Sequence, residues 1–207
     1  MTTPPSSEYV EAINDSYRAI GRYVYEFSRL VWWLKFGITQ TLQRTSTEAP
    51  WIGELLMGEA AAQQIANSFF GVMGSVDLDE EEKRVAKQLR NRVNQVIEKR
   101  NEIAHGDWWI GATAADQTLP EDPMLIRIRP VRKEGPLHHQ NLGPAELDQL
   151  SDEIRDLRVR VGEFAALATG IWSQAAGLRV HDILVVKDGE VRRAGPKAGK
   201  LVPGDYA

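Results

Sequence analysis

One apolar pattern runs without a break through the first part of the chain. Between Glu8 and about Leu42 the apolar residues follow one another at steps that alternate between three and four: Val10, Ile13, Tyr17, Ile20, Val24, Phe27, Val31, Leu34 and Ile38. Such heptad-like spacing brings one side chain per turn to the same face of an α-helix. The pattern therefore predicts a long helix that packs along a single seam.

Trp32 and Trp33 add apolar surface beside that seam. Two adjacent indoles offer more area than one partner helix covers, so a second surface is needed to bury them. A subunit interface would do so, and so would a neighbouring segment of the same chain. The sequence leaves both alternatives open.

Three further helices are predicted at residues 51–73, at 79–105 and from Pro144 to about Trp172, so the expected fold class is all-α. The helix at 79–105 begins with an acidic turn, which suits the positive end of a helix dipole. Asp77 or Asp79 can cap it.

Short strands are predicted at residues 108–110 and 125–129, joined by a polar loop, and Pro130 marks the second as an edge strand. Residues 184–191 predict a hairpin with an Asp-Gly turn. The expected architecture is an antiparallel bundle of four to five helices with a small β-hairpin insertion and a C-terminal hairpin and tail.

The expected division has three parts: a flexible tail at residues 1–7, a helical domain at 8–175 with its strands at about 107–132, and a hairpin with a mobile tail at 176–207.

Composition limits the classes of function. The net charge of the 207 residues is −4, so only a local patch can attract nucleic acid. Cysteine is absent, which excludes disulfides, thiolate metal sites and cysteine nucleophiles. The sequence shows neither a signal peptide nor an apolar run of membrane-spanning length, so we expect a cytoplasmic protein without a membrane partner.

Positive charge gathers locally at residues 83–100, which hold seven cations and one anion, Glu98. A basic helix followed by a basic strand can form a track for a phosphate backbone. The candidate RNA contacts are Arg92, Lys99, Arg127 and Arg129. The alternative is that these cations only keep an exposed surface soluble.

The end of the third predicted helix carries Arg100, Asn101 and His105, with Gly106 as a helix stop. Arg100 falls in the middle of the apolar stripe of that helix, where a guanidinium is costly unless an anion meets it. Asn101 and His105 are four apart and share a neighbouring face. The helix therefore brings a cation, an amide and a titratable imidazole to one place.

A carboxylate on another helix is the expected partner of Arg100. Glu26 is the best placed, and Glu59 is the alternative. Glu26 also lies beside Arg22 and Arg29, so an exposed ion pair with those residues is an equal interpretation. 

The pattern Arg100-Asn101-x-x-x-His105, followed by Gly106 and Trp108, resembles the signature of the HEPN superfamily. The resemblance covers roughly residues 8–175. It implies an antiparallel helical bundle that forms a homodimer and sets two motifs beside each other. Many HEPN proteins are metal-independent ribonucleases of toxin–antitoxin and other defence systems, and others are inactive binding modules.

The chemistry that this resemblance implies suits the three residues. RNA carries its own nucleophile in the ribose 2′-hydroxyl, and an imidazole can act as base or acid near neutral pH. Arg100 would hold the scissile phosphate, and Asn101 would orient the histidine or donate to a phosphate oxygen. No metal and no cofactor is expected, because no ligand set surrounds the remaining histidines: His138, His139 and His181.

The predicted function is therefore a metal-independent endoribonuclease that leaves 2′,3′-cyclic phosphate ends. An antitoxin or a nucleotidyltransferase-like protein would be a fitting partner of such a toxin. Two alternatives are a catalytically inactive helical dimer that binds a nucleotide, RNA or protein, and a structural protein in which Arg100 is only ion-paired.

Overall fold

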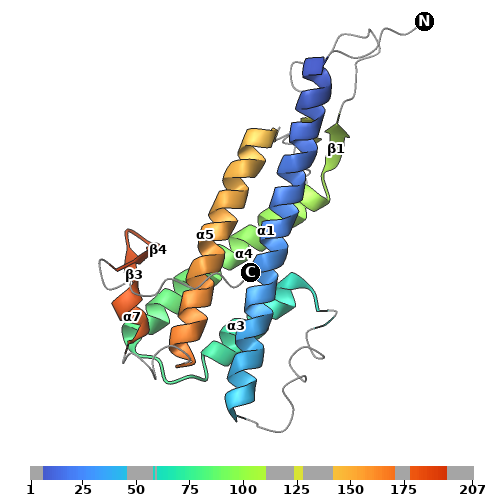
Figure 1. Ribbon diagram of the computed structural model, residues 1–207. Coiled ribbons are helices and arrows are strands. Elements are labelled where there is room, and N and C mark those ends of the chain that lie inside the picture. Colours follow the sequence, from blue (N-terminus) through green and yellow to red (C-terminus); the bar gives the residue numbers. More distant parts are fainter. Residues whose placement is uncertain are drawn as a thin grey trace, which may run out of the picture. The chain divides into compact units, whose positions relative to one another are not determined.

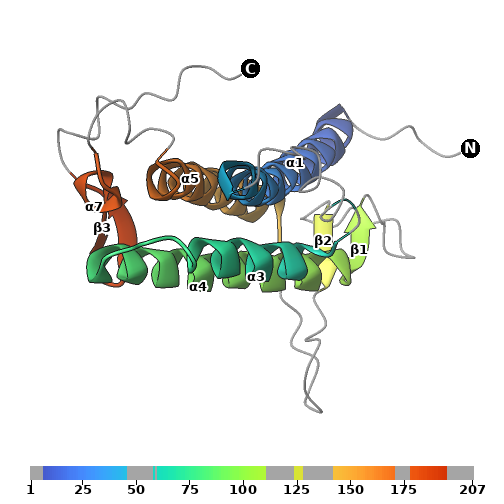
Figure 2. The same ribbon diagram turned by 90° about the horizontal axis from the view of Figure 1, so that it is seen from below.

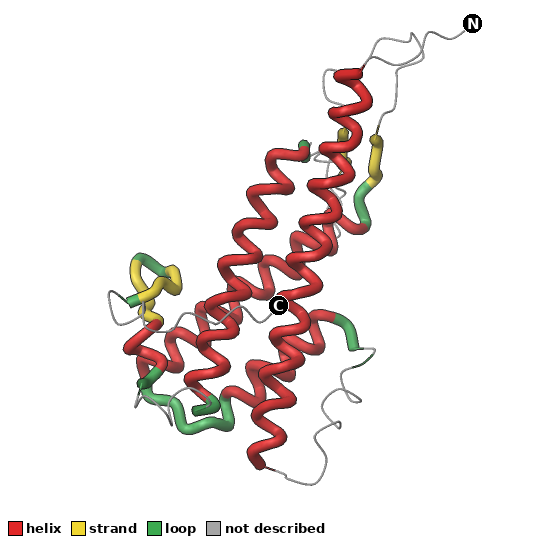
Figure 3. The backbone as a smooth tube through the Cα atoms, viewed as in Figure 1, coloured by secondary structure: helices red, strands yellow, loops and turns green. Residues whose placement is uncertain are grey.

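Helix dominates the part of the chain that the computed structural model describes, which is residues 7–45, 58, 60–110, 124–127, 142–170 and 178–194 (Figures 1 and 3). The helices are α1 (Ser7–Thr45), α3 (Ala62–Met73), α4 (Glu80–Ala104), α5 (Pro144–Ala168) and the short α7 (Val180–Ile183). They pack as a bundle, which confirms the predicted all-α class. None of these described helices is long and apolar enough to cross a membrane.

Both predicted hairpins are present. Strand β1 (Asp107–Ile110) pairs antiparallel with β2 (Met124–Arg127). Strand β3 (Leu184–Lys187) pairs antiparallel with β4 (Glu190–Arg193). The turn between β3 and β4 has φ of 54° at Asp188 and 77° at Gly189. Asp-Gly suits this two-residue connection, since such turns need positive φ at both central positions.

Local capping explains where α4 begins. The Asp79 carboxylate accepts a hydrogen bond from the backbone N–H of Glu82 at 2.9 Å, and the Glu82 carboxylate accepts one from the N–H of Asp79 at 3.0 Å. This reciprocal pair satisfies two amides that the first turn of a helix leaves open. Of the two predicted caps, Asp79 is the one used.

The predicted start of the second helix is wrong. Residues 60 and 61 are not helical, and α3 begins at Ala62, where Gln64 accepts a hydrogen bond from the N–H of Ala61 at 3.2 Å. The prediction extended the helix back to Trp51, because the alanines at 60–62 fit a helix as well as a loop; residues 51–57 lie outside the described part.

The chain divides into two compact units, and α1, α4 and α5 each contribute to both. The first unit comprises Met1–Ser28 and Val96–Arg155, and the second comprises Arg29–Gln95 and Asp156–Ala207. In the first unit, Arg22 of α1 forms ion pairs with two carboxylates of α5, Asp148 at 3.0 Å and Asp152 at 2.5 Å. In both views α1 and α5 lie side by side (Figures 1 and 2).

The predicted seam of α1 is buried only toward its end. Leu34 and Ile38 are 0% and 2% exposed, but Val10 and Tyr17 are 44% and 59% exposed. A strict three-four alternation drifts around a straight helix by about 20° per heptad. Over the length of α1 the seam therefore winds from the solvent side to the core. The prediction of one packed seam is wrong for the first half of the helix.

The second unit is closely packed where α1, α3 and α5 meet. An ideal Cβ placed on Gly37 of α1 would lie 2.5 Å from the Phe69 ring of α3 and 3.3 Å from Cβ of Ala165 in α5. The Trp33 ring packs on α5, because a Cβ placed on Gly162 would lie 3.2 Å from it. Trp33 therefore packs on a neighbouring segment of its own chain, whereas Trp32 is 48% exposed.

Replacing Gly37 by alanine tests this close approach. We expect Gly37→Ala to lower the free energy of unfolding by about 1–3 kcal/mol, because the new methyl group overlaps the buried Phe69 ring. The matched control is Gly71→Ala, at an exposed helical glycine whose Cβ would meet nothing within 4 Å. The control should raise stability by about 0.5–1 kcal/mol. Equal effects in urea titrations would contradict the packing described.

Candidate functional site

Arg100 lies in the last turns of α4, in the first unit. Its helix position is in the apolar stripe, with Val96, Ile97 and Ile103 buried around it. Arg100 itself is exposed, however, and its guanidinium lies over the ring of Phe27, 5.5 Å from the centroid. The expectation of a guanidinium on the core face is thus wrong, since the long side chain carries its charge out to the surface while its stem covers apolar atoms.

Asn101 also contacts the guanidinium of Arg100. Nη1 of Arg100 donates a hydrogen bond to Oδ1 of Asn101 at 3.3 Å. In this state the amide therefore orients the arginine through its oxygen, and its NH₂ group is the end that can donate to a phosphate.

His105 occupies the turn in which α4 ends. Its backbone N–H donates to the carbonyl of Asn101 at 3.0 Å, and Gly106 N–H donates to the carbonyl of Ile103 at 3.2 Å. Arg100, Asn101 and His105 are all exposed. The structure thus presents a cation, an amide and an imidazole to solvent at one end of one helix.

Tyr23 of α1 lies near this helix end. It was not predicted as a site residue, because it falls beside the predicted seam. It is 3% exposed, and burial raises the pKa of its phenol, with Arg100 acting in the opposite direction and Glu102 in the same one. Its hydroxyl has no hydrogen-bond partner among the described residues. A buried phenol beside Arg100 is a further polar group at this site.

Glu26 is buried at 8% exposure, so it is not the exposed carboxylate that one interpretation assumed. Arg22 pairs with carboxylates of α5, and the guanidinium of Arg29 lies 5.5 Å from the ring centroid of Trp32. Glu26 shares the core side of α1 with Tyr23 and with Phe27, whose ring contacts Arg100. Glu59, the other predicted carboxylate, lies outside the described residues.

The basic residues of α4 form two rows rather than one track. Lys83, Lys87 and Arg90 are exposed and lie within an arc of about 60°. Arg92 and Lys99 are seven apart on the opposite flank, where Lys99 pairs with Glu102 at 3.6 Å. The backbone of Arg127 pairs with Asp107 across the first hairpin. The side chain of Arg127 and all of Arg129 lie outside what the structure describes.

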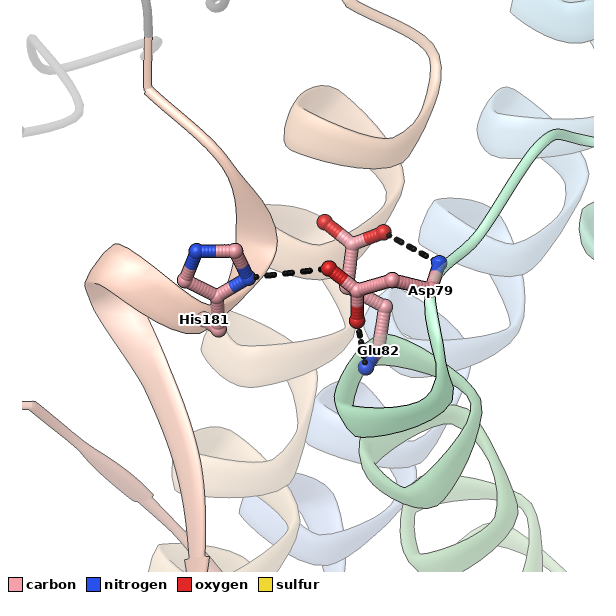
Figure 4. A group of neighbouring side chains, drawn as sticks. All are labelled: Asp79, Glu82 and His181. Atoms are coloured by element: carbon pink, nitrogen blue, oxygen red, sulfur yellow. Dashed lines mark hydrogen bonds and ion pairs between the residues drawn. The ribbon is translucent and has the colours of Figure 1, made fainter.

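A second polar cluster, in the second unit, was not predicted. Asp79, Glu82 and His181 place ligand-type atoms within 4.8 Å of one another (Figure 4). His181 was expected to be isolated, but its Nδ1 lies 3.2 Å from Oδ2 of Asp79. The pairing joins the start of α4 to α7, 102 positions later in the chain, which no local pattern reveals.

Hydrogen bonds already occupy the buried carboxylate of this cluster. Glu82 is 2% exposed and accepts two bonds from the Arg179 guanidinium, at 3.0 and 2.7 Å. It also accepts the backbone N–H groups of Asp79 at 3.0 Å and Val180 at 3.2 Å. A divalent ion would have to displace an arginine, so the arrangement suits a structural attachment of α7 to α4 better than a metal centre.

A second buried carboxylate is held in a similar way. Glu163 of α5 is 1% exposed and accepts a hydrogen bond from Arg193 of β4. Burial raises the pKa of Glu163, and Arg193 only partly offsets this. Burial also acts to raise the pKa of Glu82, but there the bonds from Arg179 and the two amides prevail and lower it. The C-terminal segment thus contributes an arginine to each of two buried glutamates.

No protein-family model matches this sequence, and neither the curated proteins nor the solved structures contain a significant match. The site must therefore be judged from its own geometry and from the motif at the end of α4.

The two buried glutamates should respond oppositely to neutralisation. At neutral pH we expect Glu82→Gln to lower the melting temperature, since its lowered pKa means that the charged form stabilises the fold. Glu163→Gln should raise it, since a raised pKa means that ionisation opposes folding. Each effect should correspond to about 1–2 kcal/mol.

The pH dependence provides the check on that interpretation. The stability due to Glu82 is present above its ordinary pKa of 4.5 and is lost as the pH falls through the lower folded value. The contribution of Glu163 is present below 4.5 and is lost as the pH rises through its higher folded value. Both variants should therefore approach the wild type in acid. Shifts of the same sign at neutral pH would contradict the assignment.

Proposed function

We propose that this chain is a HEPN-type, metal-independent endoribonuclease whose site is formed by Arg100, Asn101 and His105. The observation that carries the proposal is the exposure of all three side chains at one end of α4, where Asn101 and the Phe27 ring hold the guanidinium. A purely structural arginine would instead be expected to meet a buried carboxylate.

The proposed reaction needs only groups that the chain and its substrate supply. The 2′-hydroxyl of the ribose attacks the adjacent phosphorus as the bond to the 5′-oxygen breaks. An imidazole of His105 accepts the 2′-hydroxyl proton, and a second imidazole donates one to the departing 5′-oxygen. The guanidinium of Arg100 stabilises the charge that develops on the phosphate oxygens. The products are a 2′,3′-cyclic phosphate and a 5′-hydroxyl.

The second imidazole requires a second copy of the chain in this scheme. His105 occurs once per chain, and the remaining histidine that the structure describes, His181, pairs with Asp79 in the second unit. Base and acid must stand on opposite sides of the reacting phosphate, so two copies of the motif would provide both. An antitoxin or nucleotidyltransferase-like protein is the partner class proposed for such a toxin.

A catalytically inactive dimer that binds a nucleotide, RNA or protein is the second candidate. The observation in its favour is the hydrogen bond that Asn101 accepts from Arg100, because it orients the arginine and leaves the histidine without that support. Such a module would use the same three residues to bind a phosphate without cleaving its ester.

An RNA assay separates the two candidates. His105→Ala and Arg100→Ala should each reduce cleavage of a labelled RNA by at least about 100-fold, since each removes a group that acts in the transition state. Neither should alter the melting temperature much, because both residues are exposed. EDTA should have no effect. The matched controls are His181→Ala and Arg192→Ala, which remove the same side chains elsewhere and should leave cleavage intact.

Cleavage that survives both site substitutions, or that requires a divalent ion, would reject the mechanism. RNA binding without cleavage, weakened by Arg100→Ala, would favour the inactive module.

Salt dependence tests the basic rows of α4. Neutralising Lys83, Lys87 and Arg90 to glutamine should weaken RNA binding and reduce the slope of log affinity against log salt by about 2, because each phosphate contact on a single strand contributes about 0.7. The control is the same replacement at three exposed cations elsewhere: Arg155, Lys187 and Arg192. An unchanged slope in the first triple variant would show that this row does not contact RNA.

A further inference from the structure

The outward face of α1 carries a stripe of exposed residues without a charge. Seven positions belong to it: Val10, Asn14, Tyr17, Gly21, Tyr25, Ser28 and Trp32. At about 100° per residue they fall within an arc of about 80° on this continuous helix (Figure 1). The buried stripe of the helix, with Ala19, Tyr23 and Leu30, lies on the opposite side. A solvent-facing stripe of this length normally carries charges.

The stripe has the same chemical pattern when it is read in either direction. Its members lie four, seven and eleven positions before and after Gly21. Tyrosines occupy both positions four away, small polar residues occupy those seven away, and apolar residues occupy those eleven away. An interface between two copies related by a two-fold axis uses one patch twice, so the patch must complement itself. An antiparallel pair centred on Gly21 satisfies that condition.

The charges that flank the stripe favour the same orientation. The start of α1 is acidic, with Glu8, Glu11 and Asp15, and the exposed or half-exposed charges that follow are basic: Arg18, Arg22, Arg29 and Lys35. Antiparallel pairing sets the acidic end of one helix beside the basic end of the other, whereas parallel pairing sets like charges together. Glu11 and Arg29 lie on the same edge of the stripe. In an antiparallel pair, Glu11 of one copy would therefore face Arg29 of the other.

Gly21 makes a close crossing feasible. A Cβ placed there would meet nothing within 4 Å, so its own chain does not require a glycine at this point. A glycine in the middle of an exposed helix costs about 0.5–1 kcal/mol relative to alanine. At a crossing point it allows the two backbones to approach, and the flanking tyrosines can then close over them.

We propose that α1 pairs antiparallel with α1 of a second copy of this chain, about a two-fold axis at Gly21. The pairing goes beyond the proposed function, because the stripe lies on the side of α1 opposite Tyr23 and does not bring two copies of His105 together, and it is measured without any RNA. A different protein on this stripe would not need the symmetry about Gly21.

Sedimentation of the whole chain and of two arginine variants tests the proposal. The wild type should sediment as a dimer at micromolar concentration. Gly21→Arg should be monomeric, because two guanidinium groups would meet at the axis, and arginine improves the helix so the fold is kept. The matched control, Gly71→Arg, alters an equally open helical glycine and should remain dimeric. A monomeric wild type, a dimeric Gly21→Arg or a monomeric Gly71→Arg would each overturn the proposal.

Cysteine cross-linking tests the orientation, because the chain contains no cysteine of its own. Oxidation of a mixture of Asn14→Cys and Ser28→Cys chains should give the mixed disulfide. Asn14→Cys alone should not cross-link, since the two copies of residue 14 would be about 21 Å apart along the pair and a disulfide needs Cα atoms within about 7 Å. Self-coupling of Asn14→Cys as efficient as the mixed coupling would overturn the antiparallel arrangement.

Cleavage by the monomeric variant separates this inference from the proposed function. If Gly21→Arg is monomeric and inactive, the interface stands, and the loss of activity is attributed to the loss of the pair and not to a site at the crossing point. If it is monomeric and still cleaves RNA, the interface stands and the shared site is rejected. A dimeric Gly21→Arg rejects the interface, whatever its activity.

Discussion

The rotation of α1 about its own axis determines what this fold buries and what it exposes. The helix has apolar residues on more than one side, so its sequence alone permits more than one rotation. In the structure one of these rotations is present: apolar burial stabilises it, and the ion pairs of Arg22 with Asp148 and Asp152 join α1 to α5 in that orientation. That rotation buries Ala19, Tyr23 and Leu30. The opposite stripe, centred on Gly21, is exposed as a result.

The same rotation shapes the candidate site. Because Tyr23, Glu26 and Phe27 turn toward the core, the Phe27 ring is in place to receive the guanidinium of Arg100. The arginine can then be exposed and still be oriented, since the ring face attracts the cation and Oδ1 of Asn101 accepts a hydrogen bond from it. For the phosphate binding proposed above, a guanidinium oriented in this way would lose less freedom on binding than an unsupported one.

Features set by neighbouring residues were predictable from the sequence. The acidic start of α4, the Asp79 cap and the Asp188-Gly189 turn depend on chemistry within a few positions, and the structure contains all three. Features set by distant segments were not predictable. The pairing of His181 with Asp79 joins residues 102 positions apart, and the exposure of Arg100 depends on where α1 places Phe27. The prediction of a single packed seam on α1 was wrong for a geometric reason, because a three-four repeat does not follow one side of a straight helix.

The buried ion pairs of the C-terminal segment and the candidate site belong to different units of the chain. Arg179 and Arg193 reach Glu82 and Glu163, and both contacts belong to the second unit. Loss of the partner of a buried charge lowers the free energy of unfolding strongly, so these two contacts affect the stability of the fold. Arg100, Asn101 and His105 belong to the first unit and are exposed, so little folding energy depends on them. A substitution at the end of α4 can therefore test the proposed chemistry without loss of the fold.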